Sequence, residues 1–184
     1  NTLAYLKQQG REDEYVEMKA DDDATYDETI EIDMSTLVPM VAQPHSPDNV
    51  VDVKELEGMK INQVVIGSCT NSSLPDMMRA AKILKGRKVA EDVSLVIAPG
   101  SSSILSMLAQ NGALADMIHA GARILECGCG PCIGMGQAPL SKGVSLRTIN
   151  RNFKGRSGTN DASVYCISRS CCIICSQRLF ITGI

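Results

Sequence analysis

Hydrophobic runs in this chain end twice in glycine-rich turns that contain cysteines. The run that ends at Ile66 continues into Gly67-Ser68-Cys69, and a run that ends at Leu125 leads to Cys129-Gly130-Pro131-Cys132. Short apolar runs bounded by glycine and proline are typical of buried strands. The three thiols are therefore expected in loops that follow strands.

Strands and helices alternate from Lys60 onward. We expect strands over residues 61–66, 93–98, 122–125 and 144–149, and helices over residues 74–84 and 101–120, the second divided at Asn111-Gly112. This alternation predicts an α/β fold with a mostly parallel sheet flanked by helices. Ligands of such sheets bind beyond the carboxyl ends of the strands. Cys69, Cys129 and Cys132 should therefore meet at one sheet edge.

The N-terminal third is more polar. Residues 1–25 are interpreted as a lead-in or linker, in which Asp21-Asp22-Asp23 is a solvated turn rather than a metal site. Apolar residues alternate with polar ones over residues 26–34, which predicts a strand with one buried face. Three prolines over residues 38–52 indicate an extended loop.

Charge and composition exclude several function classes. The net charge of −3 offers no basic surface for nucleic acid. No apolar run approaches the length of a membrane span, and the first residues lack the sections of a signal peptide. The missing initiator methionine indicates that the chain begins inside a longer protein. Eight cysteines is a high count, but the chain of 184 residues is too long and too rich in regular patterns for a disulfide scaffold, so a reducing, cytoplasmic location is expected.

Three thiolates without a nearby fourth ligand suit an iron–sulfur cluster that keeps one iron open. A closed zinc site normally has four ligands. The C-x-x-C pair alone also occurs in zinc ribbons and redox disulfides, although a thioredoxin-like role would place its first cysteine at a helix N-terminus. The glycines around Pro131 allow backbone N–H groups to face cluster sulfides.

Three ordered motifs resemble signatures of the aconitase family. They are Gly67-Ser68-Cys69-Thr70-Asn71-Ser72, Cys129-Gly130-Pro131-Cys132-Ile133-Gly134 and Asn150-Arg151-Asn152-Phe153-Lys154-Gly155-Arg156. The likeness runs from about residue 26 to residue 165 and implies the three-layer sandwich of the family's third domain. The Gly-Pro-Cys-Ile-Gly spelling is more similar to aconitase than to isopropylmalate isomerase, and homoaconitase stays open.

The resemblance implies roles for eight residues. Cys69, Cys129 and Cys132 would be the thiolate ligands of a [4Fe–4S] cluster, and Arg151 and Arg156 would bind substrate carboxylates. The residues expected near the cluster are Asn150, Ser68 and Asn71. Cys127, His119 and His45 match no ligand and are interpreted as structural.

The implied activity is a hydro-lyase that interconverts citrate and isocitrate through cis-aconitate. Its tricarboxylate substrate would also need the remaining aconitase domains, so the chain alone is expected to be inactive. The alternatives are homoaconitase or a related hydroxy-acid dehydratase, a structural zinc domain, and a non-catalytic iron sensor that binds RNA. The charge and the 3% of aromatic residues make RNA the weaker interpretation.

Residues 166–184 form an anomalous tail that contains half of the cysteines. A second metal site is one interpretation, but a one-base reading-frame slip explains the segment better. Suitable codons read one base later encode Val-Ser-Pro-Glu-Val-Ala-Ala, which resembles the family's continuation. We hypothesise a frameshifted or artificially terminated C-terminus. Sequencing the encoding DNA around Tyr165 tests this, and an intact native gene with the same codons would contradict it.

Overall fold

The computed structural model describes residues 1–167, and the hypothesis about the tail lies outside them beyond Ile167. Two units are present, Asn1–Leu37 and the remainder from Val38. The first unit contains the helix α1 (Thr2–Gln8) and the 3-10 turns η1 (Glu12–Glu14) and η2 (Met34–Thr36), with no buried side chain in any of them.

The strand predicted over residues 26–34 is wrong. No strand forms there in the described chain, and Ile30 and Ile32 are 75% and 64% exposed. Alternating hydrophobicity stabilises a strand only when a partner strand and a covered face are available. This unit provides neither.

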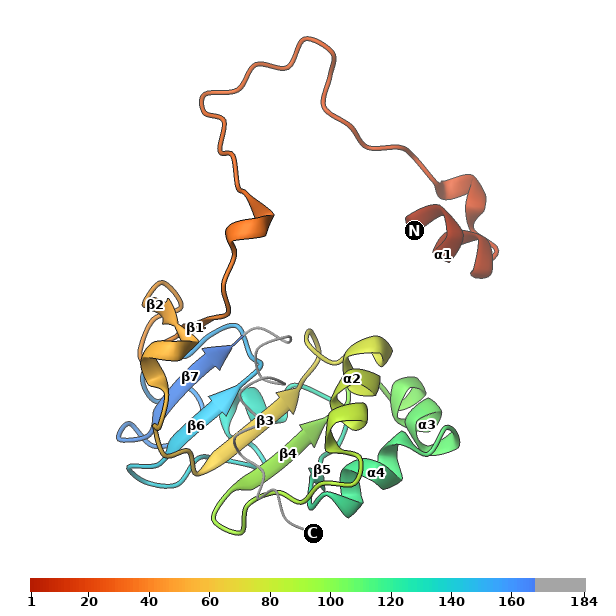
Figure 1. The fold of residues 1–184 in the computed structure, drawn as a ribbon. Helices are drawn as coiled ribbons and strands as arrows, with labels where there is room; N and C mark the ends of the chain where they lie inside the picture. The colour runs from red at the N-terminus through yellow and green to blue at the C-terminus, as the bar shows by residue number, and fades with distance from the viewer. Residues whose placement is uncertain (168–184) are drawn as a thin grey trace. The chain divides into compact units, whose positions relative to one another are not determined.

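A seven-stranded sheet forms the second unit, in the order β2-β1-β7-β6-β3-β4-β5 (Figure 1). β3 to β7 pair in parallel, whereas β1 and β2 add an antiparallel hairpin. The bounds are β1 Met40–Ala42, β2 Val50–Asp52, β3 Gln63–Gly67, β4 Ser94–Ala98, β5 Arg123–Ile124, β6 Val144–Arg147 and β7 Ser163–Ile167. The mostly parallel α/β sheet is confirmed. The extended loop predicted for residues 38–52 is corrected, because β1 and β2 lie within it.

The helices α2 (Leu74–Leu84), α3 (Ser102–Gln110) and α4 (Ala113–His119) lie where the sequence predicts them. Ser73 caps α2 and Ser101 caps α3, each accepting a hydrogen bond from a backbone N–H of the first turn. Gly112 separates α3 from α4 because its φ of 81° is accessible to glycine at little cost. The remaining 3-10 turns are η3 (Val53–Leu56) and η4 (Gly130–Ile133).

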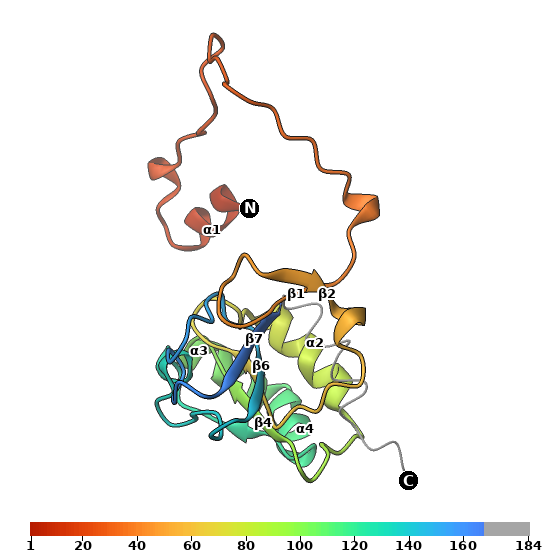
Figure 2. The same cartoon turned by 90° about the vertical axis from the view of Figure 1, so that its left-hand side faces the viewer.

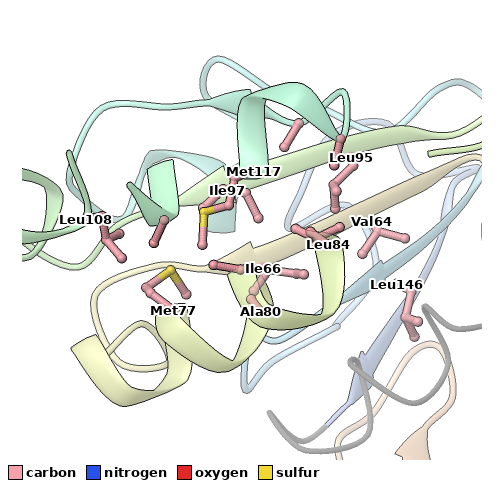
Figure 3. Close-up of a cluster of buried hydrophobic side chains, with 14 of the residues drawn as sticks. Val64, Ile66, Met77, Ala80, Leu84, Leu95, Ile97, Leu108, Met117 and Leu146 are labelled. Atoms are coloured by element: carbon pink, nitrogen blue, oxygen red, sulfur yellow. The ribbon is translucent and has the colours of Figure 1, made fainter. Parts of the chain in front are cut away.

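One face of the sheet packs against α2, α3 and α4. Alternate residues of β3, β4 and β6 point to this face and meet apolar side chains of the helices (Figure 3). The labelled members of this core are Val64, Ile66, Met77, Ala80, Leu84, Leu95, Ile97, Leu108, Met117 and Leu146.

The opposite face is covered by the crossover from β5 to β6, residues 125–143. The chain advances from β3 through β4 to β5 with its helices on one side, so a right-handed return to β6 must pass over the other side. Figure 2 shows α2 on one side of β6 and the crossover on the other. η4 is the regular element of this second layer in the described chain. Within residues 1–167, no helix is long and apolar enough to cross a membrane.

The chain leaves β3 toward β4 and leaves β6 toward β7, in opposite directions across the sheet. This reversal between adjacent parallel strands is a topological switch point, where the two departing loops diverge and leave room for a ligand. The turn after β3 contains Cys69, and the segment after β6 begins the Asn150-Arg151 motif. The topology therefore positions two of the three motifs at one crevice.

Candidate metal centre

The three motif thiols lie together at the carboxyl edge of the sheet. Sγ of Cys129 is 3.7 Å from Sγ of Cys69 and 3.2 Å from Sγ of Cys132. Cys69 and Cys129 are exposed, whereas Cys132 is 3% exposed. Residues separated by sixty positions in sequence thus share one site. All three are free thiols.

A tight turn after β3 presents Cys69. Gly67 and Ser68 have φ values of 113° and 85°, so the chain bends sharply as it leaves the strand. A Cβ atom at Gly67 would overlap the carbonyl oxygen of Ala98, which leaves glycine as the residue that fits. The hydroxyl of Thr148 accepts a hydrogen bond from the Gly67 N–H at 2.8 Å. The turn is therefore fixed to β6 as well as to β4.

The other two thiols belong to η4. Cys129 is its N-cap, Pro131 occupies the first turn, and the Cys132 N–H donates to the Cys129 carbonyl at 3.1 Å. Gly134 ends the turn with a φ of 83°, and a Cβ there would overlap the carbonyl of Ser157. Ser157 Oγ donates to the Cys132 carbonyl at 3.0 Å. The segment that follows β6 thus supports the cysteine loop directly.

The thiols differ in acidity. Hydrogen bonds with the Thr70 hydroxyl and with Cys129 lower the pKa of Cys69 below that of a free thiol. Hydrogen bonds with Cys132 and Cys69 raise the pKa of Cys129 to about 12. Cys69 is therefore the first of this pair to ionise as the pH rises.

The Asn-Arg-Asn segment lies beside the same turn. The Asn71 amide donates to Asn150 Oδ1 at 2.9 Å and also to the carbonyl of Thr148. Asn71 is buried and Asn150 is exposed, so the first holds the second in place. Ser68 is buried, and its carbonyl accepts a hydrogen bond from Ser72 Oγ.

The two arginines of the segment form one loop. Arg156 Nη1 donates to the Arg151 carbonyl at 3.2 Å, and its guanidinium lies 5.7 Å from the centre of the Phe153 ring. Within residues 1–167, neither guanidinium forms an ion pair with a carboxylate. Arg151 is exposed, so its charge is available to an anion.

The residues interpreted as structural stay outside this group. Cys127 is half-buried and forms no hydrogen bond with the three thiols in the described chain. His45 is exposed in the β1–β2 connection, and His119 is exposed at the end of α4. Thr148 and Ser157 were missed by sequence reasoning as supports of the site. Hydroxyl residues so close to the Asn150-Arg151 motif were the available signal.

The donor set distinguishes between metal chemistries. Within the part of the chain that the structure describes, no three His, Cys, Asp or Glu side chains are arranged as the shell of a single ion. Three thiols at a sheet edge, without a fourth donor, instead fit a cluster with three thiolate ligands and one open iron. The N–H groups of Cys132 and Gly134 donate to carbonyls of the same turn, which fixes the backbone that bears two of the thiols.

Comparison with known proteins identifies the family. The profile of the aconitase family (aconitate hydratase) matches residues 1–60 and 54–176. The chain is 46% identical over 169 residues to 3-isopropylmalate dehydratase large subunit 2 of Archaeoglobus fulgidus, covering 91% of this chain and 41% of the relative. It is 44% identical over 163 residues to the methanogen homoaconitase large subunit of Methanocaldococcus jannaschii, covering 88% and 39%.

A third relative, the homoaconitase large subunit of Thermus thermophilus, is 45% identical over 149 residues, covering 80% of this chain and 36% of the relative. The chain thus spans about 40% of the length of the first two relatives. The match extends beyond the three motifs on both sides. The chain belongs to the aconitase family of hydro-lyases, whose cofactor is a [4Fe–4S] cluster.

Proposed function

We propose that this chain is the cluster-binding part of the large subunit of a hydro-lyase acting on a 2-hydroxy acid with two or more carboxylates. Cys69, Cys129 and Cys132 are the cluster ligands. The observation that supports this most directly is the meeting of their Sγ atoms, at 3.7 and 3.2 Å, on one sheet edge. The Asn150-Arg151 segment begins at the neighbouring strand end of that edge.

Held by Cys69, Cys129 and Cys132, the cluster would supply a Lewis acid for the departure of the substrate hydroxyl. The chain's own residues bind and orient the substrate around it. Arg151 and Arg156 hold carboxylates through the planar fork of the guanidinium. Asn150, fixed by Asn71, directs an amide toward the same crevice. The groups that move protons are assigned to the parts of the relatives that this chain does not cover.

The relatives favour a homoaconitase or related hydroxy-acid dehydratase over an enzyme that acts on citrate and isocitrate. Citrate and isocitrate were expected from the spelling of the Gly130–Gly134 loop. The relatives are instead 3-isopropylmalate dehydratase and homoaconitase large subunits. The loop could not discriminate, because its residues surround the cluster and the thiols rather than the variable group of the substrate. We assign 3-isopropylmalate as the substrate and a homoaconitase substrate as the second candidate.

The same names indicate a separate small subunit as the partner. The relatives are large subunits by name, and among residues 1–167 no carboxylate or imidazole is hydrogen-bonded to the site residues. Assaying the full-length parent with its small subunit tests the substrate. We expect the highest kcat/KM for 3-isopropylmalate, followed by homocitrate and then citrate. A preference for citrate would restore the first interpretation.

The ligand assignment is tested by anaerobic reconstitution of the 184-residue chain with iron and sulfide. We expect about four irons per chain and a broad visible absorption. Each of Cys69→Ser, Cys129→Ser and Cys132→Ser should abolish the absorption. Cys127→Ser is the matched control and should keep it. Zinc uptake, or an equal loss in the control, would contradict the assignment.

The RNA-binding alternative has a separate test. The net charge of −3 offers no basic surface for nucleic acid. We therefore expect no binding of single-stranded RNA by the cluster-free chain at physiological salt. Tight binding that weakens steeply with salt would support a sensor instead.

A further inference from the structure

A guanidinium lies fully buried beneath the cysteine loop. Arg147 is the last residue of β6 and has an exposed fraction of 0%. On β6 it shares a face with Ser145, the face that the β5–β6 crossover covers, whereas Leu146 points into the helical core. The site described above assigns no role to this residue.

Four of the five N–H donors of Arg147 are used. Nε donates to Ser145 Oγ at 2.9 Å, and Nη2 donates to Gln63 Oε1 at 2.7 Å and to the Gln137 carbonyl at 3.1 Å. Nη1 donates to the Pro131 carbonyl. Two strands and two points of the crossover are therefore joined through one side chain, and Pro131 lies between the cluster ligands Cys129 and Cys132.

All four acceptors are neutral. Within residues 1–167, Arg147 forms no ion pair with a carboxylate. Burial lowers its pKa to about 10, so the group keeps its positive charge at neutral pH. A buried charge is costly unless a group of opposite charge lies close to it.

The titratable groups that act on this guanidinium are thiols. A negative charge on Cys132, in η4, or on Cys166, on the neighbouring strand β7, would favour its protonated form. Both are buried. The thiol of Cys166 keeps its proton at neutral pH, because burial raises its pKa to about 12. Cys132 is a proposed cluster ligand, one residue from the carbonyl that Arg147 holds, so metal binding there would create the negative charge that faces this arginine.

We propose that Arg147 is a positioning residue that serves as the built-in counter-charge of the iron–sulfur cluster, an inference that rests on the proposed function. It holds the cysteine loop through Pro131 and Gln137 and places a positive charge behind Cys132. A [4Fe–4S] core with charge 2+ and three thiolates has one net negative charge, and one-electron reduction adds a second. The buried cation stabilises the reduced cluster more than the oxidised one and raises its midpoint potential.

The test measures the midpoint potential of the reconstituted chain by titration with dithionite under argon, followed by electron paramagnetic resonance. Arg147→Met removes the charge and should shift the potential to lower values at unchanged iron content. Arg147→Lys keeps the charge but not the fork, so its potential should stay near that of the wild type while its melting temperature falls. Arg123→Met is the matched control. Arg123 also contacts Gln137, through its side chain at 2.7 Å, but is exposed.

A second variant decides the matter if Arg147→Met does not fold. Gln63→Glu keeps the arginine and the shape of its partner but places a carboxylate at the 2.7 Å contact, which cancels the charge. Its potential should also shift to lower values. An unchanged potential in both folded variants, or an equal shift in Arg147→Lys and Arg147→Met, would overturn the inference while leaving the ligand assignment intact. A wild-type chain that takes up no iron would overturn both.

Discussion

Two positions at the site admit only glycine, and each fixes a cysteine-bearing turn. Gly67 brings the turn before Cys69 against the carbonyl of Ala98. Gly134 brings η4 against the carbonyl of Ser157. In both cases a positive φ coincides with a close approach of backbone to backbone. The backbone path of both cysteine-bearing turns therefore depends on the absence of a side chain at these two positions.

Gly67→Ala should destabilise the chain more than a glycine substitution that alters φ alone. Gly121 has a similar φ of 100°, but the nearest atom to a Cβ there lies 3.9 Å away. Gly121→Ala should cost about 1–3 kcal/mol from backbone strain. Gly67→Ala should cost roughly 1–3 kcal/mol more, because the Cβ displaces Ala98. Urea unfolding of both variants measures the difference, and equal losses would show that the close approach is unimportant.

Cys166 should make stability depend on pH in the alkaline range. Burial raises the pKa of its thiol from 9.0 to about 12. Below pH 9 the thiol is protonated in both states, so it adds no pH dependence. Above pH 9 the unfolded chain loses this proton first, so stability falls with rising pH by about 1.4 kcal/mol per unit until pH 12.

The comparison is between the wild type and Cys166→Ala, both cluster-free and fully reduced. The free energy of unfolding should fall less steeply in the variant between pH 9 and 10.5, since the other thiols titrate in both proteins. Urea unfolding at four pH values measures the two slopes. Parallel slopes would mean that Cys166 ionises as easily in the folded chain as in the unfolded one.

Among the elements, β3 and β6 are joined beyond their ladder by Thr148. Its Oγ accepts from the Gly67 N–H at 2.8 Å and lies 3.4 Å from the Gly67 carbonyl. Thr148→Val keeps the shape but leaves a buried N–H without an acceptor, at a cost of about 1–3 kcal/mol. Thr148→Ser keeps the hydroxyl and should cost less than about 1 kcal/mol.

The same pair of variants should differ in how long the cluster is retained. The turn before Cys69 loses its link to β6 in Thr148→Val, so iron should be released to a chelator faster than in Thr148→Ser. Decay of the visible absorption in the presence of excess chelator measures both rates. Equal rates would indicate that β4 alone holds the turn.

Elements with two independent signals were predictable from the sequence. α2 follows a turn and has a periodic apolar face, and its predicted bounds agree with the structure. β7 was not predicted although Ser163–Ile167 contains the strand-forming residues Val164, Tyr165 and Ile167, because a run of five residues is too short to give a clear pattern. Its partners are β6 and β1, which lie far away in sequence. The strand wrongly predicted over residues 26–34 is the opposite case, because that segment has an alternating pattern but no partner strand.

Some residues of the candidate site were likewise predictable from the sequence, and others were not. The cysteines and the Asn150–Arg156 segment were predictable because each motif is local and follows a strand. Arg147 was not, because a strand residue reveals which face it occupies only when the covering layer is known. Its alternation with Leu146 was a signal, yet the sequence alone does not show that the β5–β6 crossover buries it.

At the scale of the whole molecule, the two faces of the sheet have separate tasks. The helical face supplies an apolar core that needs no polar group (Figure 3). The other face is covered by a crossover with one 3-10 turn, and the polar side chains Gln63, Ser145 and Arg147 lie beneath it. A loop has more unpaired backbone groups than a helix, and these arginine and glutamine side chains satisfy them. The buried polar layer is thus the consequence of covering a sheet with a cysteine-bearing loop.

The chain by itself should bind its cluster but not turn over substrate. It spans about 40% of the length of relatives such as the Archaeoglobus fulgidus protein, and its described site contains thiols, amides and arginines but no base beside them. Losing the positioned proton-transfer groups removes an effective concentration of roughly 10⁵ M or more. Hydration of cis-aconitate or isopropylmaleate by the reconstituted chain, followed by ultraviolet absorbance, should therefore stay at the rate of free iron–sulfur controls. Turnover that follows cluster content and disappears in Arg151→Gln would show instead that the base lies within these 184 residues.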